Sequence, residues 1–184
     1  MLKKILIVFV FVCSGIPLLA VEVSHKQIEF FVEHTAKNVT GVCNEMQMEN
    51  PNIQFVAGQY RLTSPFEIII PILKLTSGDS GRDSHIHEIL GSPEFQVIQV
   101  KVGSIQQSKT NLQKYTIKGK LTIRGNSKDF VSDAKVKVLD LGMLEVEGKL
   151  VVRFSEYNLE NPTLLFMKAK DEILVKYLFE LRMK

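Results

Sequence analysis

The chain has 184 residues, of which 45% are hydrophobic, and it carries a formal net charge of +3. This length fits one domain and allows a sizeable hydrophobic core. The first twenty residues contain two lysines and no acidic residue, so the net charge without them falls from +3 to +1. A net charge this small does not provide the excess of positive charge with which proteins bind the phosphates of nucleic acid, so we expect no nucleic acid partner.

The N-terminus has the pattern of a secretory signal peptide. Two lysines precede the apolar run ILIVFVFVC, which is too short for a comfortable membrane span, and the small residue Ala20 follows it. Leu18 is bulkier than the residue usual two positions before a cleavage point, so an uncleaved anchor is the alternative. The sequence predicts a signal peptide at 1–20, a mature domain at 21–184, and a periplasmic or secreted location.

A mature chain of this kind keeps one cysteine, Cys43. One thiol cannot close an internal disulfide, so the fold must be held together by its core. Because free cysteine is among the most buried residue types, we expect a buried and inert thiol rather than a reactive one.

Short runs rich in Val, Ile, Phe and Tyr, separated by Gly, Asn, Asp and Ser, follow the N-terminal segment and indicate strands. In YTIKGKLTIRG, residues 115–125, the apolar side chains share one face and Thr, Lys and Arg share the other. Such a strand has one dry side and one wet side. We expect about eight strands, at 28–34, 53–62, 66–73, 95–102, 115–124, 131–139, 144–154 and 172–181.

Two of these runs contain an irregularity. Pro71 cannot donate a ladder hydrogen bond, so the strand in FEIIIPIL should end or bulge near it. In PEFQVIQVKV the apolar residues change parity between Val97 and Ile98. That change predicts either a bulge at this point or a strand face of mixed character.

One segment, DSHIHEILG at 83–91, is a candidate helix. Asp83 or Ser84 can cap about two turns, and Gly91 would end them. With one short helix and about eight antiparallel strands, the fold class is all-β. Eight such strands can close into a barrel whose interior is filled by side chains or holds one small ligand.

The sequence contains no convincing catalytic set, which predicts a protein that is not an enzyme. Neither a GxSxG elbow nor a phosphate-cradling motif is present. His85 and His87 are metal-ligand types, but two residues apart on a helix they point to different sides. We therefore expect no metal site and no cofactor.

The segment RDSHI at 82–86 lies where a strand is expected to turn into the helix. We expect Arg82 to pair locally while Asp83 satisfies free helix N–H groups. The alternative is that Arg82 lies at a barrel mouth and meets an anionic head group, for which a planar guanidinium is well suited.

Four motifs, in order, resemble those of the YceI-like polyisoprenoid-binding proteins. They are F-x-V-x-H-T with a following V-x-G, then R-D-x-H-[LI], P-x-[IF] and Y-x-[VI]-x-G-x-L-T-I-x-G. The matching residues are Phe30, Val32, His34, Thr35, Val39, Gly41, Arg82, Asp83, His85, Ile86, Pro93, Phe95, Tyr115, Ile117, Gly119, Leu121, Thr122, Ile123 and Gly125. The likeness extends from Ser24 to about Leu181, nearly the whole mature chain.

This resemblance implies an exported, extended lipocalin-like barrel that holds a long isoprenoid or other lipid chain in an apolar pore. It also implies a homodimer, and a carrier of this kind would contact a membrane transiently. The residues expected to bind the ligand are Ile28, Phe30, Val32, Arg82, Ile117, Leu121, Val152 and Phe154. The alternative is a solid barrel, packed with the same side chains, that acts through its surface as a stress or adhesion protein.

Overall fold

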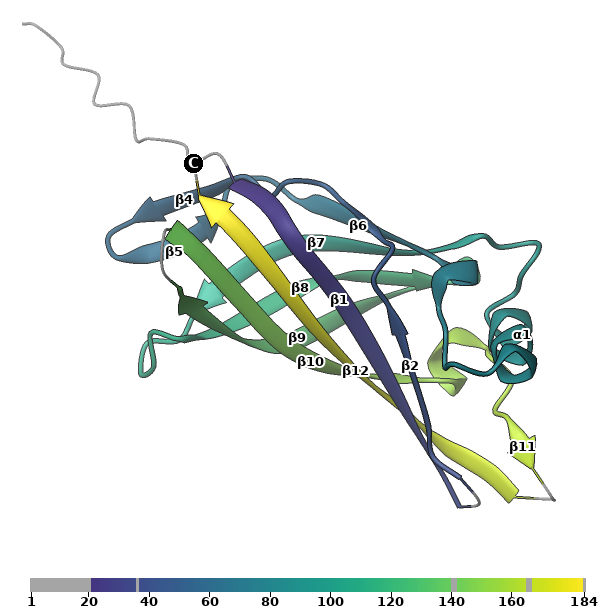
Figure 1. The fold of residues 1–184 in the computed structure, drawn as a ribbon. Coiled ribbons are helices and arrows are strands. Elements are labelled where there is room, and N and C mark those ends of the chain that lie inside the picture. The colour runs from purple at the N-terminus through teal and green to yellow at the C-terminus, as the bar shows by residue number, and fades with distance from the viewer. Residues whose placement is uncertain (1–20, 36, 140–141, 165–166, 184) are drawn as a thin grey trace, which may run out of the picture.

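The computed structural model describes residues 21–35, 37–139, 142–164 and 167–183. The predicted signal peptide therefore lies outside the described residues. The elements along the chain (Figure 1) are β1 (Val21–His34), β2 (Val39–Cys43), β3 (Gln47–Met48), β4 (Ile53–Val56), β5 (Gln59–Leu62), β6 (Phe66–Pro71), η1 (Ile72–Lys74), α1 (Ser80–Ile89), β7 (Val97–Gln107), β8 (Lys114–Ile123), β9 (Asn126–Val138), β10 (Met143–Arg153), η3 (Ser155–Tyr157), β11 (Thr163–Leu164) and β12 (Met167–Met183).

Ten of these strands form one antiparallel sheet that curls strongly into a barrel (Figure 1). Nine of them lie in the order β2-β1-β12-β10-β9-β8-β7-β6-β3, and β11 pairs with β12. Backbone hydrogen bonds of 2.8 and 3.0 Å between Val42 and Thr76 tie the β2 edge to the segment after β6. The prediction of an all-β, lipocalin-like antiparallel barrel with a short helix is confirmed.

The prediction of one strand at 53–62 is wrong, because this segment is a hairpin. Ala57 and Gly58 have φ values of +50° and +77°, and Val56 pairs directly with Gln59 across this two-residue turn. Positive φ at both central residues is the backbone of a turn that matches the twist of a hairpin. The resulting pair, β4 and β5, forms a separate two-stranded sheet. The sequence patterns also missed β2, β3 and β11, which are five residues or fewer.

The two predicted irregularities have different outcomes. β6 ends at Pro71, as expected. β7 begins at Val97, so the parity change at 97–98 marks the start of the strand and is not a bulge. The register shift in β7 lies further on, between Val102 and Ser104. It occurs at Gly103, and it keeps the apolar residues on both sides of the shift facing the barrel interior.

The helix begins earlier than the sequence pattern suggested. Its N-cap is Asp79, whose Oδ1 accepts a hydrogen bond of 2.9 Å from the Arg82 backbone N–H. Asp83 lies inside the first turn, so the prediction that Asp83 or the following serine caps the helix is wrong. The expected stop is confirmed, because Gly91 has a φ of +94° just after the helix, a conformation that favours glycine.

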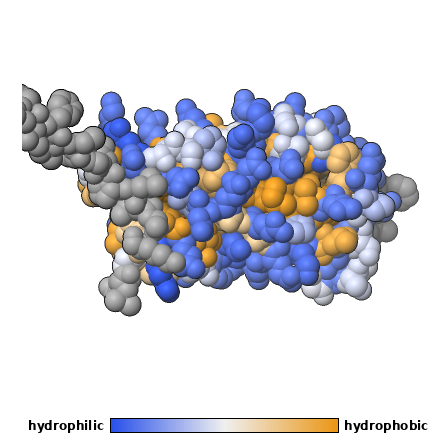
Figure 2. All heavy atoms as spheres, turned by 90° about the horizontal axis from the view of Figure 1, so that it is seen from above, coloured by the Kyte–Doolittle hydropathy of each residue, from blue (hydrophilic) through white to orange (hydrophobic). Residues whose placement is uncertain are grey.

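The strand alternation predicted from sequence is confirmed. In β8, Tyr115, Leu121 and Ile123 are buried, whereas Lys118 and Lys120 are exposed. Adjacent residues of one strand therefore face opposite sides of the barrel wall. Figure 2 shows one face of the outer surface, which is mainly hydrophilic with hydrophobic patches between the polar side chains.

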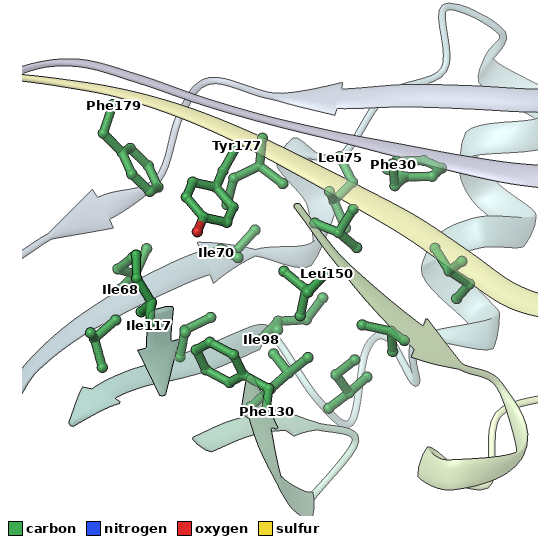
Figure 3. A pocket seen from close by; sticks show the side chains of 18 of the residues that line it. Phe30, Ile68, Ile70, Leu75, Ile98, Ile117, Phe130, Leu150, Tyr177 and Phe179 are labelled. Atoms are coloured by element: carbon green, nitrogen blue, oxygen red, sulfur yellow. The ribbon is translucent and has the colours of Figure 1, made fainter. Parts of the chain in front are cut away.

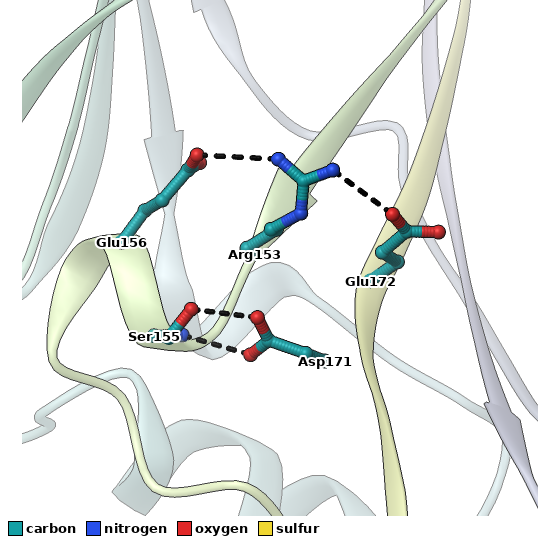
Figure 4. Close-up of polar contacts among 5 residues, drawn as sticks. All are labelled: Arg153, Ser155, Glu156, Asp171 and Glu172. Carbon is teal, nitrogen blue, oxygen red and sulfur yellow. Dashed lines mark hydrogen bonds and ion pairs between the residues drawn. The ribbon is translucent and has the colours of Figure 1, made fainter.

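Polar contacts fix the end of β10 against β12 (Figure 4). The Arg153 guanidinium lies 3.4 Å from Glu156 and 3.0 Å from Glu172. In the same place the Ser155 backbone N–H and hydroxyl donate to the Asp171 carboxylate at 3.0 and 2.6 Å. These hydrogen bonds from Ser155 hold the pKa of Asp171 below its usual range.

Candidate functional site

A cavity of about 530 Å³ lies inside the barrel. Ordinary protein interiors are close-packed and contain few voids larger than a water molecule. Ligand pockets, by contrast, typically measure about 300–1,000 Å³. Figure 3 shows part of the set of side chains that line this space, and nearly all of the lining side chains are aliphatic or aromatic. The barrel therefore encloses a space of ligand size.

All eight residues that the sequence singled out line this one cavity. They are Ile28, Phe30, Val32, Arg82, Ile117, Leu121, Val152 and Phe154. Strand register explains the convergence, since Val32 pairs with Ile173, and Ile173 pairs in turn with Val152. Residues paired across neighbouring strands point to the same side of a sheet. Whether these side chains bind a ligand stays a prediction.

Three aromatic rings in the cavity wall each cover a glycine of the neighbouring strand. A Cβ atom at any of these glycines would overlap the facing ring, so only glycine lets the ring lie this close to the wall. The sequence signal was available, because each glycine falls on the inward-facing parity of an apolar strand. The pairs are Phe30 with Gly41, Phe130 with Gly119, and Tyr177 with Gly148.

The polar groups of the wall near Tyr177 are paired with one another. Ser132 is only 1% exposed, and its hydroxyl lies 2.9 Å from the Lys149 carbonyl oxygen and 2.8 Å from the Tyr177 hydroxyl. Burial raises the pKa of Tyr177, so the phenol stays neutral at physiological pH. In Figure 3 its hydroxyl carries the one red oxygen among the side chains drawn. This part of the wall is neutral.

The exposed residues of the cavity wall lie at the end of the barrel that carries α1. Among the described lining residues, only Lys37, His85 and Thr163 are exposed. They come from the segment before β2, from α1 and from β11, which Figure 1 shows at the same end of the molecule. At the hairpin end, lining residues such as Ile53 and Tyr115 are 5% and 4% exposed. This contrast makes the α1 end the mouth.

The charged groups that line the cavity are all basic. They are Lys37 and Arg82, with His34 and His85 as titratable neighbours, and no Asp or Glu occurs among the described lining residues. The Arg82 side chain donates from Nε to Ser77 Oγ at 2.7 Å and from Nη2 to the Ser77 carbonyl at 2.9 Å. The predicted local pairing of Arg82 is therefore confirmed, and Arg82 also lines the cavity.

The two histidines of α1 point to different partners. His87 Nε2 lies 2.8 Å from the Leu75 carbonyl oxygen, whereas His85 Nδ1 lies 3.9 Å from Glu88. Across the described ranges, no three His, Cys, Asp or Glu side chains are grouped so that they could hold a metal ion. No helix in the described part of the chain is long and apolar enough to cross a membrane.

The thiol of Cys43 is buried, as the sequence predicted. Its exposed fraction is 1%, and burial raises its pKa. A raised pKa lowers the fraction of thiolate, which is the nucleophilic form. Cys43 is part of the core that supports the cavity wall.

Apart from Arg82, the sequence patterns missed the contribution of α1 to the cavity wall. Ile86, Ile89 and Leu90 all line the cavity. Their spacing of three and four residues is the signature of an apolar helix face, which could have predicted this contact.

Comparison with known protein families identifies one domain. A family model, the YceI-like domain, matches residues 19–181. No curated protein sequence matches the chain.

Several solved structures share the fold. BcnA of Burkholderia cenocepacia has a TM-score of 0.67 at 14% identity, over 84% of this chain and 95% of that one. A polyisoprenoid binding domain from Saccharophagus degradans, implicated in plant cell wall breakdown, has a TM-score of 0.64 at 11% identity, over 90% of this chain and 99% of that one. The YCEI protein of Campylobacter jejuni has a TM-score of 0.64 at 18% identity, over 80% of this chain and 86% of that one. At these identities, the likeness shows the fold alone.

Proposed function

Because the chain belongs to the YceI-like domain family, we propose that it is a non-enzymatic carrier of a polyisoprenoid or other long-chain lipid. One similar structure is a polyisoprenoid binding domain, which supports this class of ligand. The observation that carries the proposal is the apolar cavity of about 530 Å³, which opens at the α1 end. A barrel that acted only through its surface would have no need of this space.

Transfer of a hydrocarbon chain into this cavity is favourable on simple physical grounds. Each buried methylene group contributes about 0.8 kcal/mol, so a chain of ten gains about 8 kcal/mol before the costs of association. The cavity already exists, so the protein loses little conformational freedom on binding. Selectivity among chains would come from their length and width, because the wall offers few polar partners.

The proposal includes export of the protein. We expect the predicted signal peptide, residues 1–20, to be removed during export. N-terminal sequencing of the secreted or periplasmic protein should then begin near Val21. A mature protein that retains Met1 would contradict this part of the proposal.

The proposal also includes homodimer formation and transient membrane contact. Light scattering coupled to gel filtration measures the first, and co-sedimentation with lipid vesicles measures the second. A monomer at all concentrations, or no sedimentation with any vesicle, would remove the corresponding part without affecting the lipid-binding proposal.

Filling the cavity tests the carrier function directly. Val152 is 4% exposed and lines the cavity, so Val152→Trp would occupy space that a lipid chain would otherwise take. Val151 lies next to it on β10 and is 51% exposed, so Val151→Trp is a matched control. Titration with a fluorescent prenyl probe measures binding, and thermal melting measures stability.

We expect Val152→Trp to lose probe binding with little change in Tm, whereas Val151→Trp keeps both properties. If the interior were packed, the added bulk would cost about 1–3 kcal/mol and lower the Tm by several degrees. That result, or unchanged probe binding by Val152→Trp, would contradict the proposed function.

A further inference from the structure

The charge at the cavity mouth is of one sign. Among the described residues, Lys37, Arg82, His34 and His85 line the cavity, and no carboxylate does. Glu88 lies 3.9 Å from His85 Nδ1 and offers that imidazole a partner. The permanent charges that face the cavity are therefore those of Lys37 and Arg82.

The Arg82 guanidinium is held in place by the loop before α1. Its two hydrogen bonds to Ser77 leave three N–H donors of the guanidinium for other partners. Thr76, next to Ser77, exchanges backbone hydrogen bonds with Val42 of β2. Lys37 lies two residues before β2, so both cations belong to segments at the cavity mouth.

Nearby carboxylates have other partners. Asp83 accepts a hydrogen bond of 2.7 Å from the Ser77 backbone N–H, and Asp79 caps α1. Glu33 lies 2.8 Å from Lys170. Within the described ranges, neither cation of the mouth forms an ion pair with a carboxylate. The Ser77 hydroxyl accepts from Arg82 Nε and donates to Asp83, so this carboxylate reaches Arg82 only through Ser77. An anion that reached the mouth would therefore find two cations that have no direct carboxylate partner.

From this arrangement we infer that the bound lipid is anionic, with a carboxylate or phosphate head group at Arg82 and Lys37. The inference rests on the proposed function, because the apolar chain would occupy the cavity behind the mouth. A guanidinium binds two oxygens of a carboxylate or phosphate through parallel hydrogen bonds. A neutral alcohol would place the same chain in the cavity without these charge-assisted bonds.

A set of ligands with the same chain separates the head group from the tail. Geranylgeraniol, geranylgeranoic acid and geranylgeranyl phosphate would each compete with a neutral fluorescent prenyl probe. The variants are Arg82→Gln, Lys37→Gln and their combination. Arg82→Lys is a further variant, which keeps the positive charge but not the two hydrogen bonds to Ser77, and it shows whether loss of those contacts disturbs the loop. Lys118→Gln on the outer face is the matched control.

We expect wild type to bind the acid, the phosphate or both at least about tenfold more tightly than the alcohol, the effect of one charge-assisted hydrogen bond. The double variant should lose this preference and still bind the alcohol, while Lys118→Gln behaves as wild type. A preference for one anion identifies the head group. Equal affinities in wild type, or a preference that survives in the double variant, would overturn the inference. Failure of all three ligands would instead contradict the proposed function.

Discussion

The ring of Tyr177 covers Gly148, its direct partner across the β10–β12 pair. The Tyr177 side chain extends past β10 toward β9, where its hydroxyl lies 2.8 Å from Ser132 Oγ. A side chain at position 148 would overlap the Tyr177 hydroxyl and ring, so the glycine keeps this large residue against the wall. The space enclosed by the barrel therefore depends on a residue that has no side chain.

Replacement of this glycine should be costly for both stability and binding. In Gly148→Ala the new methyl group would push the Tyr177 ring toward the cavity. This shift would break the hydrogen bond between Tyr177 and the buried Ser132, and an unsatisfied buried polar group costs about 1–3 kcal/mol, which lowers the Tm of a domain of this size by several degrees. Thermal melting and prenyl-probe titration measure the two effects.

Gly103→Ala is the matched control for that experiment. A Cβ atom at Gly103 would have its nearest neighbour, the Lys118 carbonyl oxygen, at 3.7 Å, which is ordinary van der Waals contact. We expect this variant to behave as wild type. Equal Tm values for Gly148→Ala and Gly103→Ala would show that the ring has room to move.

A charge on the inner face should destabilise the barrel, whereas the same charge on the outer face should not. Leu121 is 7% exposed, so Leu121→Asp buries a carboxylate without a partner, at a cost of more than about 2 kcal/mol. Lys118→Asp is a cleaner control than Lys120→Asp, because Lys120 lies 2.9 Å from Asp129. Thermal melts of both variants should differ sharply. Similar losses would mean that the strand alternation is not what orients these side chains.

The pH dependence of stability should report on the loop before α1. Hydrogen bonds from the Ser77 side chain, the Thr76 hydroxyl and the Ser77 backbone lower the pKa of Asp83. A lowered folded-state pKa gives stability that is present above the unfolded value, about 3.9, and lost as the pH falls through the folded value. Asp83→Asn should therefore lower the Tm at pH 7, and the difference from wild type should shrink below about pH 4.

Melts at several pH values, with the exposed Glu94→Gln as control, measure that difference. A Tm difference between Asp83→Asn and wild type that stays constant from pH 7 to pH 3 would show that ionised Asp83 does not stabilise the loop.

The sequence predicted the long strands well because each has a dry face and a wet face. The alternation around Leu121 and Val152 is sufficient to place both residues in the wall. The hairpin at 53–62 was misread because Ala57 and Gly58 form its whole turn, and alanine is not a usual turn residue for positive φ. The helix cap was misplaced because Asp79 and Asp83 are the same residue type, and only the backbone geometry distinguishes them.

The cavity itself could not be predicted from alternation. A strand face such as Ile28, Phe30 and Val32 has the same pattern whether it meets other side chains or an enclosed space. The difference depends on strand register, which brings Tyr177 over Gly148 and leaves the centre of the barrel open. Register is set by the patterns of both paired strands and by the turn that joins them, so the alternation of one strand alone does not specify it.

Mass spectrometry of an organic extract of the purified protein is the most direct test of lipid carriage. We expect a long-chain lipid in nearly stoichiometric amount from wild type, and none from Val152→Trp prepared in the same way. If wild type yields no lipid, even after incubation with a prenyl alcohol and repurification, the cavity does not hold a ligand and the carrier function is contradicted.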